Sequence, residues 1–133
     1  MAKLIQILLL SAAAIAVPAG AAQRDTPEAK LQKMLTGRVE GPAVDCINLS
    51  TITSSQIIDG KAIVYRSGGK LYVNEPRSGA DSLNDDDILV TRTFSSQLCS
   101  VDTVRLIDRT SRFPRGFVLL GKFVPYTKPK AAN

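Results

Sequence analysis

The strongest concentration of side chains that could bind a ligand lies in the run RTSRFPR, residues 109–115. Three arginines surround one phenylalanine in a segment that we expect to be an exposed loop between two strands. Guanidinium groups form paired hydrogen bonds with phosphates and carboxylates. The run therefore predicts either a contact site for an anion or a partner, or a solvated hairpin loop. Its candidate contact residues are Arg109, Arg112 and Arg115.

Tyr65 and Tyr72 are the second pair of candidate contact residues. A two-residue turn at Gly68-Gly69 would place them opposite each other on neighbouring antiparallel strands, beside Ile63. Tyrosine is frequent at interfaces because its ring is stiff and amphipathic. The two rings are therefore expected to form a contact patch, unless the helix or the last strand covers this face.

The residue types that are missing exclude several chemistries. The chain has no histidine, which removes the usual general base, the histidine-dependent triads and the commonest zinc ligand. The run Asp85-Asp86-Asp87 lacks the alternating carboxylates, central glycine and closing glutamate of an EF-hand loop, which favours a solvated cluster over a calcium site. We therefore expect no catalytic residue, no metal and no cofactor. A small hydrolase using serine or carboxylate chemistry is the alternative.

The N-terminal residues predict export. Lys3 precedes the apolar run Leu4–Val17, Pro18 interrupts it, and residues 19–22 are the small residues that a signal peptidase requires. An uncleaved membrane anchor needs about 18 or more apolar residues, and Cys46 lies too far along the chain to be the lipid-bearing cysteine of a lipoprotein. Residues 1–22 therefore predict a secretory signal peptide, cleaved to leave a soluble periplasmic or secreted protein.

Both cysteines, Cys46 and Cys99, lie in the part of the chain that remains after this cleavage. An exported protein reaches an oxidising compartment, where two such cysteines are expected to pair as a disulfide. The alternative is two free thiols used for catalysis or for a metal. The mature chain of about 110 residues is the size of one domain, and a domain this small gains from a covalent link.

The charge of the chain permits an anionic partner without requiring one. Its formal net charge of +5 at pH 7 becomes +4 when Lys3 leaves with the signal peptide. This basic bias allows contact with an envelope protein or with anionic envelope material such as lipid headgroups or glycans. No nucleic-acid-binding motif is present, so nucleic acid is not an expected partner, and any membrane contact is expected to be peripheral.

Residues 23–37 predict an N-terminal segment with one short helix. Thr26 can cap the helix, Pro27 suits its first position and Gly37 ends it. Apolar side chains recur between these limits at helical spacing, at Leu31, Met34 and Leu35. The helix is expected to lie at the edge of the domain and to dock through Leu31 and Leu35, because alone it would be marginal.

From residue 38 onward the pattern is that of β-strands. Short apolar runs alternate with turn signals such as Asp59-Gly60 and Gly68-Gly69. The expected strands are 45–49, 56–58, 61–66, 70–74, 88–94, 103–108 and 117–124. Residues 38–127 therefore predict one mainly β domain, a small antiparallel barrel or sandwich of about six strands, followed by a flexible tail at 128–133.

Two-residue turns at both turn signals would give residues 56–74 the register of a three-stranded meander. Ile57 would face Ala62, and Val64 would face Val73. One side would then form the core, with Ile57, Ala62, Val64, Leu71 and Val73. The other side would be half apolar and half polar, with Gln56, Ile63, Tyr65, Tyr72 and Asn74.

Three short motifs stand out in this β region: Cys46-Ile47, Leu98-Cys99-x-x-Asp102 and Gly121-x-Phe123-x-Pro125-Tyr126. Together they resemble a family of small exported bacterial proteins for which no activity is established, over about residues 37–127. The resemblance implies export and a β fold, and it implies no catalytic residue.

Relatives in that family often carry two further cysteines, near position 80 and near positions 118–119, which this chain lacks. If those two pair with each other, Cys46–Cys99 is the bridge that this chain retains. If they do not, the pairing of Cys46 with Cys99 is open.

These observations predict an exported β-domain protein that binds a partner or associates with the cell envelope, and that is not an enzyme. One concrete form is an inhibitor of an envelope-targeting enzyme such as lysozyme, because residues 67–72 loosely resemble the Ser/Gly/Lys/Tyr loop of such inhibitors.

Overall fold

The computed structural model describes residue 13, residues 15–17, residue 20 and residues 23–130. The predicted signal peptide falls largely outside these residues, and so does its cleavage site; the last three residues of the predicted tail also lie outside them. Within the described residues, no helix has the length and apolar composition needed to cross a membrane.

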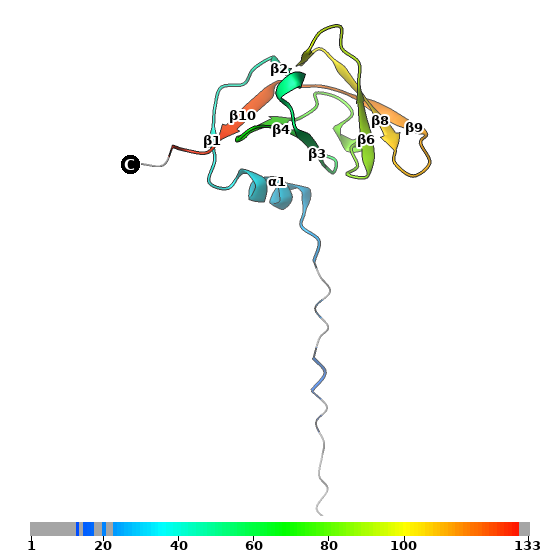
Figure 1. Cartoon of the computed structure of the whole chain (residues 1–133). Helices are drawn as coiled ribbons and strands as arrows, with labels where there is room; N and C mark the ends of the chain where they lie inside the picture. Colours follow the sequence, from blue (N-terminus) through cyan, green and yellow to red (C-terminus); the bar gives the residue numbers. More distant parts are fainter. Residues whose placement is uncertain (1–12, 14, 18–19, 21–22, 131–133) are drawn as a thin grey trace, which may run out of the picture.

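The described chain is mainly β, with one α-helix and ten strands in three antiparallel sheets (Figure 1). No sheet closes into a barrel, so the sandwich is the correct one of the two predicted alternatives. The elements are α1 (Pro27–Leu35), β1 (Val39–Glu40), β2 (Cys46–Asn48), the 3-10 turn η1 (Leu49–Thr51), β3 (Ser54–Ile58), β4 (Ala62–Ser67), β5 (Lys70–Asn74), the 3-10 turn η2 (Ala80–Ser82), β6 (Asp87–Thr91), β7 (Gln97–Cys99), β8 (Thr103–Asp108), β9 (Pro114–Leu119) and β10 (Phe123–Thr127).

The number of strands exceeds the prediction for two reasons. The expected strand 117–124 is two strands, β9 and β10, which belong to different sheets. In addition, β1 and β7 are too short for their side chains to show a repeating pattern, although each pairs with a longer-range partner, β10 and β2. Tertiary pairing, which no local pattern reports, makes them strands.

The structure confirms the predicted N-terminal helix and its capping residue. The Thr26 hydroxyl oxygen accepts a hydrogen bond from the Ala29 amide at 3.2 Å, and Pro27 is the first helical residue. Gly37 has φ +75°, a backbone conformation that favours glycine at the end of a helix. The helix lies over one face of the five-stranded sheet, where Leu31 is buried. It therefore forms a layer of the fold rather than an edge.

The five-stranded sheet is the central layer, with strand order β1-β10-β5-β4-β3. Its first side packs against α1 and forms a small core that consists of Leu31, Ile58, Ala62, Val64, Leu71 and Val73. Its second side packs against the three-stranded sheet β6-β8-β9 and the two-stranded sheet β2-β7. Both sides of β4 are therefore buried, as in the middle strand of a layered fold.

The register of the first hairpin corrects the sequence prediction. Ile58, not Ile57, is the partner of Ala62, because the loop holds three residues, Asp59–Lys61, with Gly60 at φ +63°. This one-residue difference moves Ile57 to the second side and Ile58 to the helix side. The second hairpin has the predicted two-residue loop, and its pairs Tyr65–Tyr72 and Val64–Val73 are confirmed.

The side of the meander that was expected to be half polar is the main core. Ile57, Ile63 and Tyr65 point between the sheets and meet the inward side chains of β8 and β9. Those inward residues are Val104, Leu106 and Val118, all with no exposed surface. The prediction assumed that one side of the meander faces solvent, whereas α1 and a second sheet cover both.

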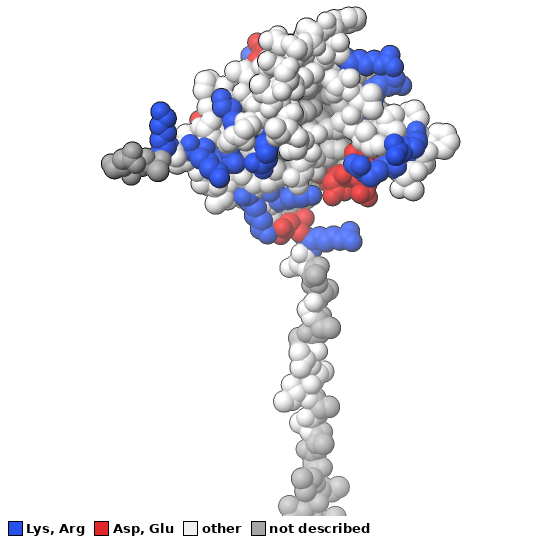
Figure 2. Space-filling model, in the orientation of Figure 1, with Lys and Arg blue, Asp and Glu red and all other residues white. Residues whose placement is uncertain are grey.

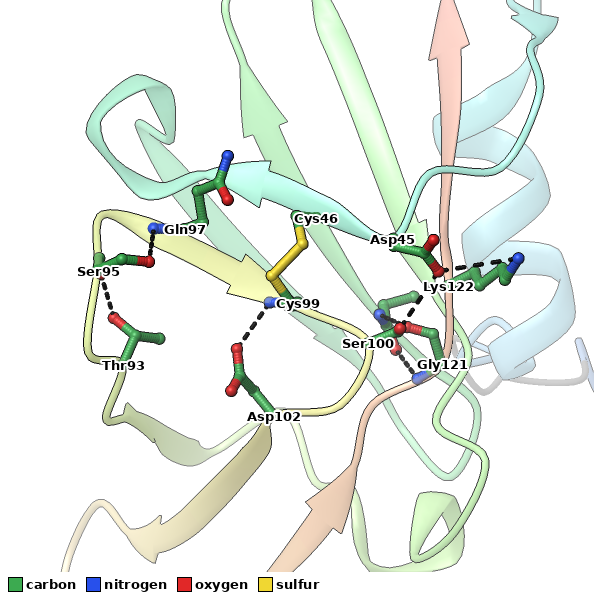
Figure 3. The surroundings of a disulfide bond; sticks show 11 residues. Asp45, Cys46, Thr93, Ser95, Gln97, Cys99, Ser100, Asp102, Gly121 and Lys122 are labelled. Carbon is green, nitrogen blue, oxygen red and sulfur yellow. Dashed lines mark hydrogen bonds and ion pairs between the residues drawn. A yellow bond between two sulfur atoms is a disulfide. The ribbon is translucent and has the colours of Figure 1, made fainter.

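The disulfide Cys46–Cys99 is present, as predicted (Figure 3). The two cysteines are directly opposite each other in the β2–β7 pair, and their neighbours Ile47 and Leu98 are buried in the main core.

Candidate functional site

The arginine run forms the hairpin between β8 and β9, with a loop built on Asp108. One oxygen of the Asp108 carboxylate accepts hydrogen bonds from the Thr110 amide at 2.9 Å and the Ser111 amide at 2.7 Å. Bonds from Ser111 lower the pKa of Asp108, because they stabilise its charged form. Arg112 has φ +63° and its amide donates to the Asp108 carbonyl. The hairpin is therefore an ordered loop.

The three arginines of the hairpin have different surroundings. Arg115 places a guanidinium nitrogen 3.4 Å from a carboxylate oxygen of Asp87. Arg109 lines a polar cavity of about 440 Å³ between β3 and β6, together with Lys30 and Asp85, which form their own ion pair at 3.5 Å. Arg112 lies at the tip and is exposed. Figure 2 shows acidic side chains gathered beside basic ones on the face that it presents. Arg115 is thus paired with a carboxylate of the protein itself, and Arg109 shares a cavity with two, Asp85 and Asp87.

Asp87 is the most perturbed carboxyl group near this hairpin. It was expected in a solvated acidic cluster, but it is 4% exposed, and one of its oxygens has no hydrogen-bond partner in the described structure. Burial raises the pKa of Asp87. The positive charge of Arg115 lowers this pKa, and the negative charges of Asp108, Asp86 and Asp59 raise it further. Asp87 contributes to the lining of the same cavity as Arg109, but its side chain is only 1% exposed and one oxygen faces the Arg115 guanidinium. This favours a structural role over acid catalysis.

Replacement of Asp87 by Asn is expected to raise the free energy of unfolding at pH 7 by about 1 kcal/mol, because a buried, half-satisfied charge disappears. Since the folded state holds the Asp87 proton more tightly, stability should fall as pH rises from the ordinary carboxyl pKa of about 4 through the raised folded value. Thermal unfolding of D87N and wild type, measured between about pH 4 and pH 7, should show a difference in melting temperature that widens as pH rises. Exposed Asp81→Asn, which is not among the charges that act on Asp87, is the control. A D87N protein that is less stable at pH 7 would contradict the prediction.

Tyr65 is not available as a contact residue. It is 4% exposed, its ring packs edge-on against Phe123 at 5.9 Å between centroids, and burial raises the pKa of its hydroxyl. Tyr72 is half-buried against the main core, and the Lys70 ammonium lies 5.6 Å from its ring centroid. The two rings are neighbours as expected, but the second sheet covers the face that they share. The predicted tyrosine patch is therefore part of the core.

An exposed apolar side chain, Phe117, lies instead among half-buried ones on the solvent side of the sheet β6-β8-β9. Because Leu89, Leu106 and Val118 point into the main core, strand alternation turns their neighbours outward. We call these outward side chains the outer face: Ile88, Val90, Thr103, Arg105, Ile107, Phe117 and Leu119. Phe117 is 58% exposed, and none of the apolar members belongs to either core.

Two further phenylalanines extend beyond the outer face, at opposite ends of its sheet. Phe94 lies in the β6–β7 connection and is fully exposed, and Phe113 lies in the β8–β9 hairpin and is 71% exposed. Figure 1 shows these two connections at the two ends of the sheet. Sequence reasoning missed Phe94 and Phe117, although the alternation in residues 103–108 contains the signal once the pairing of Arg105 with Phe117 is known.

Ser67 and Lys70 have the S-x-x-K spacing of a class of serine hydrolases. Here they are opposite each other across the Gly68-Gly69 turn. The Ser67 hydroxyl donates to the Thr51 hydroxyl at 3.0 Å, and no hydrogen bond joins Ser67 to Lys70 in the described part of the chain. The Arg38 guanidinium donates to the Gly69 carbonyl at 2.7 Å, so the turn is held against the N-terminal segment. This arrangement is that of a packed hairpin.

Among residues 23–130, no three His, Cys, Asp or Glu side chains are grouped as metal ligands. The acidic run is divided: Asp87 faces Arg115, and Asp85 faces Lys30. The chain has no match among protein-family models, curated proteins or solved structures.

Proposed function

We propose that this protein is an exported, non-enzymatic binding protein of the cell envelope that contacts its partner through the outer face. The observation that carries the proposal is the apolar surface around Phe117, which no core cluster absorbs. Contiguous exposed apolar surface next to arginine is typical of a contact site, because aromatic and arginine side chains are enriched at interfaces. No acidic residue belongs to the outer face, which favours a partner with negative charge.

Export is supported by the N-terminal pattern and by the disulfide. Residues 1–22 have the order of charged, apolar and small residues that signal peptides share. The bridge Cys46–Cys99 is the kind of link that persists in oxidising compartments. The two together support a periplasmic or secreted location.

Binding is favoured over catalysis by the positions of the polar groups. The one strongly buried carboxyl group, Asp87, faces Arg115 and is closed to solvent in the described structure. The S-x-x-K pair lies on a packed hairpin. In contrast, the outer face is open, and binding requires no reactive group there.

The test is affinity capture from an envelope extract with residues 23–133 as bait, at low salt and at about 0.5 M salt. The core contacts lie within residues 31–126, so this bait retains them. The variant Phe117→Ser should lose the captured material, and Val39→Ser, which removes a 56% exposed apolar side chain from β1, should retain it. Capture that is equal for the two variants, or absent in both salts, would overturn the proposal.

The identity of the captured material separates the alternatives. A lysozyme-type enzyme retained at high salt would select the inhibitor function. Anionic envelope material retained only at low salt would select a protein held by charge, because salt screens exposed charges.

A further inference from the structure

We propose that one end of the outer face binds an anionic phospholipid surface, with a phosphate headgroup between Arg92 and Arg105. This inference rests on the proposed function and commits it to a lipid partner. Val90 pairs with Arg105, and Arg92 lies two residues beyond Val90, so the two arginines extend from the same side of the sheet. Both line a cavity of about 320 Å³, which is open at the surface.

The two guanidinium groups are available for an anion. Within the described residues, neither Arg92 nor Arg105 forms a salt bridge or a side-chain hydrogen bond, whereas Arg115 and Arg38 both have partners. One carboxylate, Asp102, also lines the cavity, but one of its oxygens accepts a hydrogen bond from the Cys99 amide at 2.7 Å. A planar guanidinium pairs well with a phosphodiester, so two of them beside one cavity favour a phosphate-bearing ligand.

Exposed apolar side chains lie at this end of the sheet, and one of them, Val101, lines the cavity. Phe94 is fully exposed in the β6–β7 connection, and Val101 is 76% exposed in the β7–β8 connection. Both connections leave the sheet at the same end, since Thr91 pairs with Val104. Phe117, the strand partner of Arg105, continues the apolar surface. We call this group the tip patch: Arg92, Phe94, Val101, Arg105 and Phe117.

The loops of the tip patch are held in place around the disulfide (Figure 3). The Thr93 hydroxyl donates to the Ser95 carbonyl at 2.6 Å, and the Gln97 amide donates to the Ser95 hydroxyl at 3.2 Å. On the other side of Cys99, the Ser100 amide donates to the Asp45 carbonyl at 2.7 Å. Phe94 and Val101 are therefore exposed on ordered loops, which makes their exposure a feature of the fold.

A lipid surface fits this shape better than a protein partner does. A protein interface gains most from anchors that enter complementary pockets, but here the apolar side chains stand out from loop ends instead of lining a groove. A bilayer interface accepts projecting side chains without matched shape, and a cationic rim adds attraction to anionic lipid. The tip patch has both the projecting apolar side chains and the cationic rim, and the carboxylate beside it, Asp102, accepts a backbone hydrogen bond.

The experiment is flotation of residues 23–133 with vesicles of phosphatidylglycerol and phosphatidylcholine in equal parts, and with phosphatidylcholine alone. We expect binding to the anionic vesicles that weakens as salt rises. The double variant R92S/R105S should bind about 25-fold more weakly, since each arginine near an anionic surface contributes about fivefold. Replacement of Lys128 and Lys130 by Ser removes the same charge from the tail and should change binding little.

The apolar part of the proposal has its own variant. Phe94→Ser should weaken vesicle binding by about tenfold and leave the salt dependence unchanged, because it removes buried apolar area and no charge. Val39→Ser is the matched control. Equal loss in R92S/R105S and K128S/K130S, or equal binding to both vesicle types, would overturn the lipid site. If vesicles fail to bind while Phe117→Ser still abolishes capture of a protein, the lipid inference fails and the proposed function stands; if capture fails too, both fail.

Discussion

Replacement of Cys46 and Cys99 together by alanine is expected to lower the free energy of unfolding by about 4 kcal/mol. The bridge closes a loop across 53 residues, and the unfolded chain gains entropy when that loop opens. The sheet β2-β7 has three residue pairs, too few to be stable alone, and the disulfide joins the pair at one end of it. Its loss should also loosen Leu98, which has no exposed surface.

Urea unfolding of wild type and the C46A/C99A double variant measures this loss. A reductant should lower the free energy of unfolding of wild type to about that of the variant. The same reductant should leave the free energy of unfolding of the variant unchanged. Mass spectrometry of the oxidised protein should find no free thiol. A difference below about 1 kcal/mol, or two alkylatable cysteines, would contradict the role of the bridge.

Asn74→Ala is expected to lower the free energy of unfolding by about 2 kcal/mol, because it leaves two partly buried backbone groups of Gly121 without protein partners. The Asn74 amide nitrogen donates to the Gly121 carbonyl at 2.7 Å, and the Gly121 amide donates to the Asn74 side-chain carbonyl oxygen at 3.0 Å. Asn74 itself has no exposed surface. Position 121 must be glycine, because a Cβ there would overlap the Glu75 carbonyl.

Chemical denaturation of Asn74→Ala against wild type tests this clamp. The matched control is Gln56→Ala, which removes an exposed amide and should change stability by less than about 0.5 kcal/mol. A loss for Asn74→Ala no greater than that of the control would show that the two hydrogen bonds do not hold β5 to the β9–β10 connection.

The motifs that carry the family resemblance have structural roles throughout. Cys46 and Cys99 form the bridge, and Phe123 fills the main core with no exposed surface. Asp102 accepts a hydrogen bond from the Cys99 amide, and Gly121 is held by Asn74. In this chain the named residues of the motifs therefore serve the architecture. None of them is a member of the tip patch, although Val101 occupies one of the unspecified positions between Cys99 and Asp102.

The candidate contact residues show where local pattern stops being informative. Arg115 looked free in the sequence, yet it pairs with Asp87, a carboxylate that begins another strand, and Arg109 lines a cavity together with Asp85. Tyr65 looked like an interface residue, yet a second sheet covers it. In each case the decisive neighbour is distant in the chain, and residue type alone does not identify it.

By itself the sequence determined the elements whose causes are local. Capping by Thr26, the stop at Gly37 and the Gly68-Gly69 turn each depend on a few adjacent residues, and the two cysteines together with the export pattern were enough for the disulfide. Only the tertiary structure decided the three-residue loop at Asp59–Lys61, the burial of both sides of β4 and the exposure of Phe94 and Phe117. These depend on which sheet packs on which, and the free energy of that packing comes from contacts between residues far apart in the chain.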